Sequence, residues 1–315
     1  MNAPVIDVGG THVTAALADT LRWRTVDGTR QRMPLRSDGT AAEIIAALVS
    51  AVRPLGDISA LVLGVSMPGP FDYAEGIGRF HDVAKFAALN GVDVGAALRA
   101  ALPAPPVRIA FVNDASAFAI GEWIGGAAQG AGRVVGITLG TGVGSAFLDH
   151  GHVISDGPDV PPGGYAHLLR INGRPLEDVV SRRAIIAAYQ SASGSGTAGI
   201  PPVDVDTIAQ RAADGDAVAR SVFDRAIGAL GDALRPWLIR FGADVLVVGG
   251  GMATSWEIIE PPLRDSLLHA GTLPGPAWKG GTLVHSRDTE ESNLVGAAWH
   301  ALNAPTDMPN ERSAG

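Results

Sequence analysis

Apolar residues run along this chain in short blocks that are separated by glycine-rich or polar turns. The stretch "PVIDVGGTHVTAALAD", residues 4–19, has an apolar block on each side of Gly9-Gly10 and predicts a strand, a turn and a second strand. The stretch "VVGITLGTGVGSAFLD", residues 134–149, has the same layout when Gly9 is placed on Gly140. We interpret the two as copies of one unit, which predicts two related halves that face a common ligand.

The blocks between and after these two units alternate in type. Continuous apolar runs predict buried strands, and apolar residues spaced three and four apart predict helices. Strands that alternate with helices indicate an α/β fold. The predicted strands span residues 60–69, 107–115 and 243–256; the helices span 40–55, 92–102, 116–124, 176–190 and 216–241, the last kinked or broken near Pro236; residues 191–202 form a mobile loop, and a disordered tail begins at Asn303.

Composition narrows the class of protein. A chain of 315 residues with 46% hydrophobic residues can build two domains. Its net charge of -8 argues against nucleic acid as a partner, and the absence of cysteine excludes disulfides, thiolate metal sites and a cysteine nucleophile. Neither a signal peptide nor a membrane-spanning apolar run is evident, so we expect a cytoplasmic protein without a membrane partner.

Three glycine-rich turns, at Gly9-Gly10, 140–144 and 249–251, end or join apolar strands. Glycine lets a backbone approach a ligand closely and aim its N–H groups at anionic oxygens, and threonine hydroxyls beside the turns add donors. The three together predict a nucleotide-phosphate site; the alternative is three unrelated turns. The chain has no Walker A sequence and no protein-kinase signature.

Two acidic positions are candidates for chemistry. Asp7 stands beside the first turn, where a carboxylate suits Mg²⁺ held through water; a turn-forming aspartate is the alternative. In "FVNDASAFAIGEW", Asn113 and Asp114 stand where a buried strand passes into a helix, the place where ligands gather in α/β folds. Asp114 is either a helix N-cap or a general base for an alcohol, with Asn113 orienting the hydroxyl group.

The stretch "GGYAHLLRINGRPLED" holds His167 after a pair of glycines and Glu177 ten residues later. A single histidine supplies one ligand, whereas metal sites need three or four. The loop is therefore a metal site, a substrate-binding loop or an ordinary turn with a structural histidine, and only the rest of the chain can decide.

With these residues assembled, the chain resembles the ROK family of sugar kinases. The resemblance runs from about residue 5 to 300 and rests on "DVGGT", "GVSMPGPFD", "VNDASAFAIGEW", "TLGTGVGSAF", "GGYAH", "LEDVVSRRAI" and "VVGGGM", in this order. It implies a two-domain actin-like ATPase fold, ribonuclease H-like, with a cleft between the domains. We expect an N-terminal domain over residues 1–115, a C-terminal domain over 116–302 whose last helix can pack back on the first domain, and a tail over 303–315.

The resemblance also implies a role for each matching position. The implied activity is ATP-dependent phosphorylation of a primary hydroxyl, equivalent to O6 of a hexose. Asp114 takes the position of the catalytic base, and acceptor-binding positions fall on Gly69, Asn113, His167 and Glu177. ATP-binding positions fall on Asp7, Gly9, Gly10, Thr11, Gly140, Thr141, Gly142, Gly144, Gly250 and Gly251, with Asp7 also the position for Mg²⁺ through water.

The chain departs from the family pattern in the histidine loop. The family commonly reads G-E-x-G-H and then carries zinc-binding cysteines; here Gly164 replaces the glutamate, and Pro175 stands where the last cysteine would be. We therefore expect no zinc site. The missing glutamate removes an acceptor of hydrogen bonds, which leaves glucose, an amino sugar and a sugar-like cyclitol as candidate substrates.

Alternatives to an ATP-dependent kinase stay open. One is a catalytically silent sugar-binding sensor of the same family. A repressor is disfavoured, since Asp7 already belongs to the first turn and about 60 residues of DNA-binding domain would have to precede it. Polyphosphate could replace ATP as the donor, although the chain has only two lysines to bind such a polyanion. The family resemblance suggests a homodimer or a dimer of dimers.

Overall fold

The computed structural model describes residues 1–81, 83–194, 203–268 and 276–304. The chain divides into two compact units, and each is described by itself. Unit 1 contains residues 1–113 and the segment from residue 297 onward, and unit 2 contains residues 114–296. Most of the expected loop at 191–202 and of the expected tail at 303–315 lies outside the described residues.

Unit 1 is built on a mixed sheet with the strand order β3-β2-β1-β5-β8, and β4 also pairs with β2. β1 and β2 are antiparallel, whereas β1, β5 and β8 run parallel. The apolar run of β1 is buried from its second residue to its last, as expected for a central strand covered on both faces. The strands are β1 Asn2–Val8, β2 His12–Asp19, β3 Arg24–Thr25, β4 Gln31–Pro34, β5 Val62–Met67 and β8 Arg108–Asn113, with a small hairpin of β6 Phe71–Asp72 and β7 Ile77–Gly78 beside the sheet.

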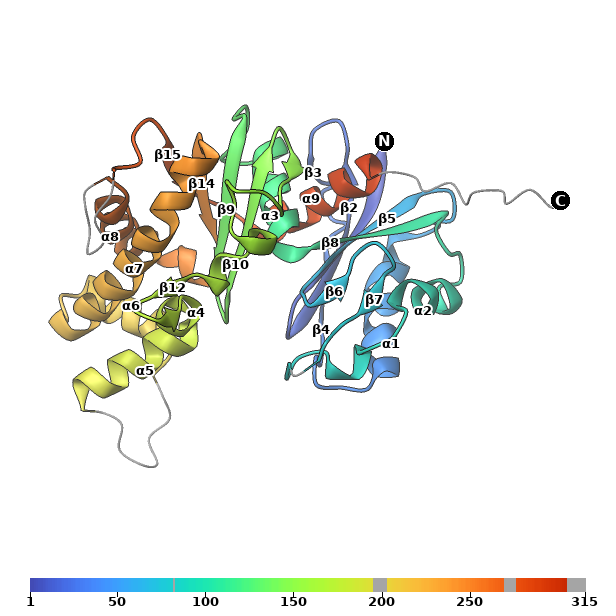
Figure 1. Ribbon diagram of the computed structural model, residues 1–315. Helices are drawn as coiled ribbons and strands as arrows, with labels where there is room; N and C mark the ends of the chain where they lie inside the picture. Colours follow the sequence, from blue (N-terminus) through green and yellow to red (C-terminus); the bar gives the residue numbers. More distant parts are fainter. Residues whose placement is uncertain (82, 195–202, 269–275, 305–315) are drawn as a thin grey trace. The chain divides into compact units, whose positions relative to one another are not determined.

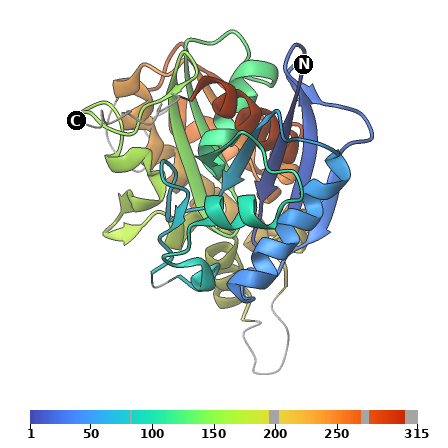
Figure 2. The same cartoon turned by 90° about the vertical axis from the view of Figure 1, so that its right-hand side faces the viewer.

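Helices α1 (Ala41–Val52) and α2 (Val94–Ala101) pack against each other in unit 1, and they appear in blue and teal in front of the sheet in Figure 2. α1 begins where the sequence predicts a helix. Thr40 accepts a hydrogen bond from the backbone N–H of Glu43, and the Glu43 carboxylate accepts one from the Thr40 N–H. This reciprocal cap satisfies two donors that the first turn would otherwise leave unpaired.

Unit 2 repeats the arrangement of unit 1. Its sheet has the order β11-β10-β9-β14-β15, with an antiparallel β9–β10 pair followed by parallel β14 and β15. Figure 1 shows α3 on one face of this sheet and α6, α7 and α8 on the other. The strands are β9 Arg133–Leu139, β10 Val143–Asp149, β11 His152–Val153, β14 Val245–Gly249 and β15 Thr282–His285, with a separate hairpin of β12 Arg170–Ile171 and β13 Arg174–Pro175.

The helices of unit 2 differ from the sequence prediction in four places. The predicted helix over 176–190 is two helices, because Ser181 caps a new helix by accepting a hydrogen bond from the Ala184 N–H. α7 runs unbroken through Pro236, since buried residues on both sides of the proline hold the helix against the core. α6 and α8 were not predicted. The helices are α3 Asp114–Gly125, α4 Glu177–Val180, α5 Arg182–Ser193, α6 Val205–Ala213, α7 Ala217–Phe241 and α8 Trp256–Leu268, and α9 Thr289–Asn303 spans the division between the units.

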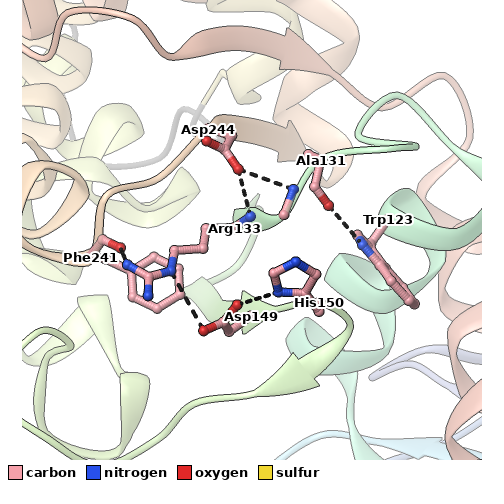
Figure 3. A network of polar contacts seen from close by, with 8 residues as sticks. Trp123, Ala131, Arg133, Asp149, His150, Phe241 and Asp244 are labelled. Atoms are coloured by element: carbon pink, nitrogen blue, oxygen red, sulfur yellow. Dashed lines mark hydrogen bonds and ion pairs between the residues drawn. The ribbon is translucent and has the colours of Figure 1, made fainter.

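A polar network lies at the start of β9 and the end of β10, the strand ends opposite to the turn at residues 140–144 (Figure 3). The Asp244 carboxylate accepts hydrogen bonds from the backbone N–H groups of Gly132 and Arg133, and the Arg133 guanidinium donates to the Phe241 carbonyl at 2.8 Å. Asp149 accepts a hydrogen bond from His150 at 2.6 Å, and this bond is the main cause of its lowered pKa. The bonds to Asp244 hold the start of β9 beside the start of β14.

The expected α/β architecture is confirmed within each unit. Within the part of the chain that the structure describes, no helix is both long and apolar enough to cross a bilayer.

Candidate functional site

The first glycine turn, residues 9–11, connects β1 with β2 in unit 1. Its first N–H donates to the His12 carbonyl at 2.9 Å, which closes the turn. Asp7, the predicted magnesium position, is only 6% exposed and accepts a hydrogen bond of 2.7 Å from the Ser66 hydroxyl on β5. This bond orients the carboxylate beside the turn. The turn and Asp7 are candidates from the sequence, whereas the sequence indicates no role for Ser66.

Asp7 fits a magnesium ion that is held mainly by water and phosphate. Among the described residues, no group of three His, Asp or Glu side chains is placed to hold a metal ion. Mg²⁺ keeps much of its hydration shell and needs few protein carboxylates, whereas a structural zinc ion needs four protein ligands. The buried carboxylate of Asp7 has the oxygen chemistry that such a hydrated ion uses.

A second cluster in unit 1 forms around Asn113 at the end of β8. The Asn113 side-chain amide donates to the Tyr73 hydroxyl at 2.9 Å, and the same hydroxyl donates to the Met67 carbonyl at 3.2 Å. Gly69 lies beside them, because a Cβ on this glycine would be 3.2 Å from the Tyr73 hydroxyl and 3.9 Å from the Asn113 amide nitrogen. The structure thus brings together the two predicted acceptor-binding residues of unit 1, through a tyrosine that the sequence analysis missed.

Asp114 is the first residue of α3, directly after Asn113. Its side chain is half-buried, and Oδ1 accepts a hydrogen bond of 3.0 Å from the N–H of Ala115. Its place as the first residue of α3 suits either of the two roles expected for it, a helix N-cap or a general base.

The second glycine turn, residues 140–144, lies between β9 and β10 in unit 2. Within it, the Gly140 N–H donates to the Gly142 carbonyl at 3.0 Å. Its outer contacts come from the segment at α4 and α5: the Arg182 N–H donates to the Gly140 carbonyl, and the Val143 N–H donates to Oε2 of Glu177 at 3.4 Å. A Cβ on Gly142 would lie 2.8 Å from that Glu177 oxygen. The structure therefore brings Glu177, a predicted acceptor-binding residue, against a predicted phosphate turn.

The third glycine turn, residues 249–251, packs against the strand that leads into the second. Gly250 has a φ of 88°, and a Cβ there would lie 2.3 Å from the Leu139 carbonyl oxygen. Its N–H donates to the hydroxyl of Thr289 at 2.9 Å. Gly251 opens the short 3₁₀ helix Gly251–Ser255 that precedes α8. Only glycine fits at position 250, since it combines a left-handed backbone with contact to another backbone.

The histidine loop of unit 2 has a backbone that explains one departure from the family pattern. Gly164, at the position where the family commonly has glutamate, takes a φ of 71°, a conformation that side chains of L-residues rarely adopt. Its carbonyl accepts a hydrogen bond of 2.6 Å from the Ser145 hydroxyl, which in turn accepts one from the Ala166 N–H. His167 is half-buried beside Tyr165, with the ring centroids 5.3 Å apart.

Comparison with known proteins places the chain among relatives with a shared fold. The model of the ROK family matches residues 4–304. A glucokinase of Thermotoga maritima is 26% identical over 315 residues, which cover 93% of this chain and 95% of that one. The crystal structure of a ROK family glucokinase from Streptomyces griseus in complex with glucose and AMPPNP is similar with a TM-score of 0.74 at 22% identity, over 95% of this chain and 98% of that one. This likeness confirms the predicted two-domain actin-like ATPase fold.

A third relative is not named as an enzyme. The DNA-binding transcriptional repressor Mlc of Escherichia coli is 23% identical over 249 residues, which cover 75% of this chain and 59% of that one.

Proposed function

We propose that this chain, which belongs to the ROK family, is a carbohydrate kinase that transfers the γ-phosphoryl group of ATP to a primary, O6-like hydroxyl of a hexose, an amino sugar or a cyclitol. The observation that carries the proposal is the junction of β8 and α3, where Asn113 and Asp114 follow one another at the carboxyl end of a parallel strand. The glucokinase relative and the neighbouring structure with glucose and AMPPNP support the class of reaction and the donor.

In the proposed reaction, the Asp114 carboxylate accepts the proton of the acceptor hydroxyl. The hydroxyl oxygen forms a bond to the γ-phosphorus, the bond from that phosphorus to the bridging oxygen breaks, and the electron pair leaves with ADP. Asn113 orients the hydroxyl group, and its bond to Tyr73 fixes the amide in place. Little covalent chemistry is asked of the protein, so positioning supplies most of the rate.

We assign the donor phosphates to backbone N–H groups of the first and second glycine turns, with the hydroxyls of Thr11 and Thr141 as further donors. Gly250 and Gly251 serve the adenosine. Mg²⁺, when bound, neutralises charge on the donor phosphates, and Asp7 would hold it through water.

We assign acceptor recognition to Gly69, Asn113, His167 and Glu177. The left-handed backbone at Gly164 supports a modified acceptor site, because the position has no side chain to contact the sugar. The candidate acceptors to be tested are therefore glucose, other hexoses, amino sugars and cyclitols.

The experiment couples ADP release to an optical signal across this panel of acceptors. Turnover that needs magnesium is expected with at least one acceptor, and Asp114→Asn should lower kcat by roughly 10²- to 10⁴-fold, the usual contribution of a general base. Asp224→Asn, at an exposed position of α7, is the matched control and should keep full activity. Full turnover by Asp114→Asn would overturn the assigned mechanism. Polyphosphate in place of ATP tests the alternative donor in the same assay.

A catalytically silent sugar sensor is the second candidate. The likeness to the repressor Mlc favours it, together with the glycine at position 164. Isothermal titration calorimetry separates the two functions. Tight sugar binding without ADP formation in the presence of ATP and magnesium would establish the sensor, and turnover would exclude it.

A further inference from the structure

An ammonium group lies against the first glycine turn. The chain has only two lysines, Lys85 and Lys279, among 24 basic residues. A Cβ placed on Gly10 would lie 2.9 Å from Nζ of Lys85 and 3.1 Å from its Cε. The end of this side chain therefore sits directly on the turn that is proposed to bind phosphate.

The segment that carries Lys85 is held in place by its neighbour Phe86. The Phe86 side chain is 1% exposed and packs on Phe80, with ring centroids 5.5 Å apart. Its N–H donates to the carbonyl of Ser37 at 2.7 Å, and its φ of 59° gives the chain a sharp bend there. This buried neighbour holds the backbone at position 85 in place, while the Lys85 side chain itself is exposed.

The same region of backbone also holds the turn. The Leu35 N–H donates to the carbonyl of Thr11 at 2.9 Å, two residues before the Ser37 carbonyl that accepts from Phe86. One short segment after β4 therefore binds the first glycine turn at one point and the lysine-bearing segment at another. These two backbone hydrogen bonds hold the backbone of the lysine-bearing segment close to the backbone of the turn.

A positive charge beside a phosphate-binding turn has a specific chemical role. The chain as a whole carries a net charge of -8, and the exposed Lys85 supplies a positive charge next to the turn. A phosphoryl group in transfer spreads negative charge over its equatorial oxygens, and a positioned cation stabilises that charge. We propose that Lys85 is a phosphate-binding residue of the first glycine turn and that its ammonium contacts the terminal phosphate of the donor. This inference rests on the proposed kinase function for the identity of the donor.

Substitution gives the first test. Lys85→Met should lower kcat/KM for ATP by about ten- to a hundredfold, the range for one lost charge-assisted hydrogen bond, and Lys85→Arg should restore part of the loss. Lys279→Met, at the other lysine of the chain, is the matched control and should behave as wild type. The acceptor KM should change little in Lys85→Met. Unchanged kinetics in a folded Lys85→Met protein would overturn the inference and leave the kinase function standing.

Chemical labelling gives a test that does not need turnover. The wild-type protein is treated with an amine-acetylating reagent, and the rates at Lys85 and Lys279 are measured by peptide mass spectrometry, with and without a non-hydrolysable ATP analogue and magnesium. At an analogue concentration ten times its Kd, we expect the rate at Lys85 to fall about tenfold and the rate at Lys279 to stay the same.

The two proposals can fail separately in this experiment. Protection of Lys85 in a protein that phosphorylates no acceptor would support the phosphate contact and count against the kinase. Equal labelling of Lys85 with and without bound analogue would overturn the contact, whatever the activity.

Discussion

The first and second glycine turns have the same arrangement of flanking strands but contact side chains of opposite charge. Each joins an antiparallel pair of strands in its own unit, and each pair continues into parallel strands. The first turn has the Lys85 ammonium against Gly10, whereas the second has the Glu177 carboxylate against Gly142. The repeated sequence therefore encodes the strands and the turn, while the chemical character of each turn comes from a segment elsewhere in its unit.

This difference suggests unequal roles for the turns. An ammonium attracts phosphate oxygens, so the first turn suits the terminal phosphate of the donor. A carboxylate repels them, so Glu177 fits better as a group that holds the second turn through the Val143 N–H and receives hydrogen bonds from an acceptor hydroxyl.

The largest effect is a loss of stability expected at Gly250, whose backbone contacts the backbone of Leu139 beside the second turn. Gly250→Ala would need a left-handed alanine and would place its Cβ 2.3 Å from the Leu139 carbonyl oxygen. We expect the free energy of unfolding to fall by roughly 2–5 kcal/mol, the sum of a left-handed alanine and an overpacked contact. Urea denaturation measures it. Gly251→Ala is the matched control, because no heavy atom lies within 4 Å of a Cβ there; equal stability of the two variants would contradict the packing described.

An intermediate effect is expected at the carboxylate of the second turn. Glu177→Gln keeps an oxygen for the Val143 N–H but removes the negative charge. We expect the acceptor KM to rise about tenfold, since a charged acceptor of hydrogen bonds becomes a neutral one, and the ATP KM to stay within about twofold. Steady-state kinetics measures both constants, with the exposed Glu257→Gln as control. A rise confined to the ATP KM would reassign Glu177 to the donor side.

The smallest effect on stability is expected for Gly10→Ala. The added methyl group meets the flexible end of Lys85 and no backbone atom, and Gly10 does not have a left-handed backbone. We expect the free energy of unfolding to change by less than about 1 kcal/mol, as side chains at the surface usually adapt. The displaced ammonium should still weaken ATP binding by about three- to tenfold. Gly228→Ala, on α7 with no heavy atom within 4 Å of the added Cβ, is the control and should leave ATP affinity near that of wild type.

The sequence predicted the elements whose signals are local. The two strand–turn–strand units, the helix that begins at Thr40 and the strand that ends at Asn113 all have apolar patterns with clear boundaries. The break expected near Pro236 is absent, and Pro261 and Pro262 likewise lie inside α8, a helix without a sequence prediction; the core of unit 2 holds both helices. Helix propensity is weaker than tertiary packing at such places.

The candidate site could be predicted only as a set of separate residues. The contact of Asn113 with Tyr73 joins residues 40 positions apart, and the contact of Val143 with Glu177 joins residues 34 positions apart. Neither contact has a periodic or motif signal in a single sequence, and the place of Lys85 beside Gly10 has none either. Such pairings depend on how loops fold over the sheet edge, which local pattern does not encode.

The most direct test of the contrast between the two turns is the binding of ATP to the Lys85→Met and Glu177→Gln proteins without any acceptor. Isothermal titration calorimetry with magnesium gives Kd for each variant and for the wild type. The account predicts that Lys85→Met weakens ATP binding about tenfold or more, while Glu177→Gln stays within about twofold of wild type. Equal affinities for all three proteins, or a loss confined to Glu177→Gln, would contradict it.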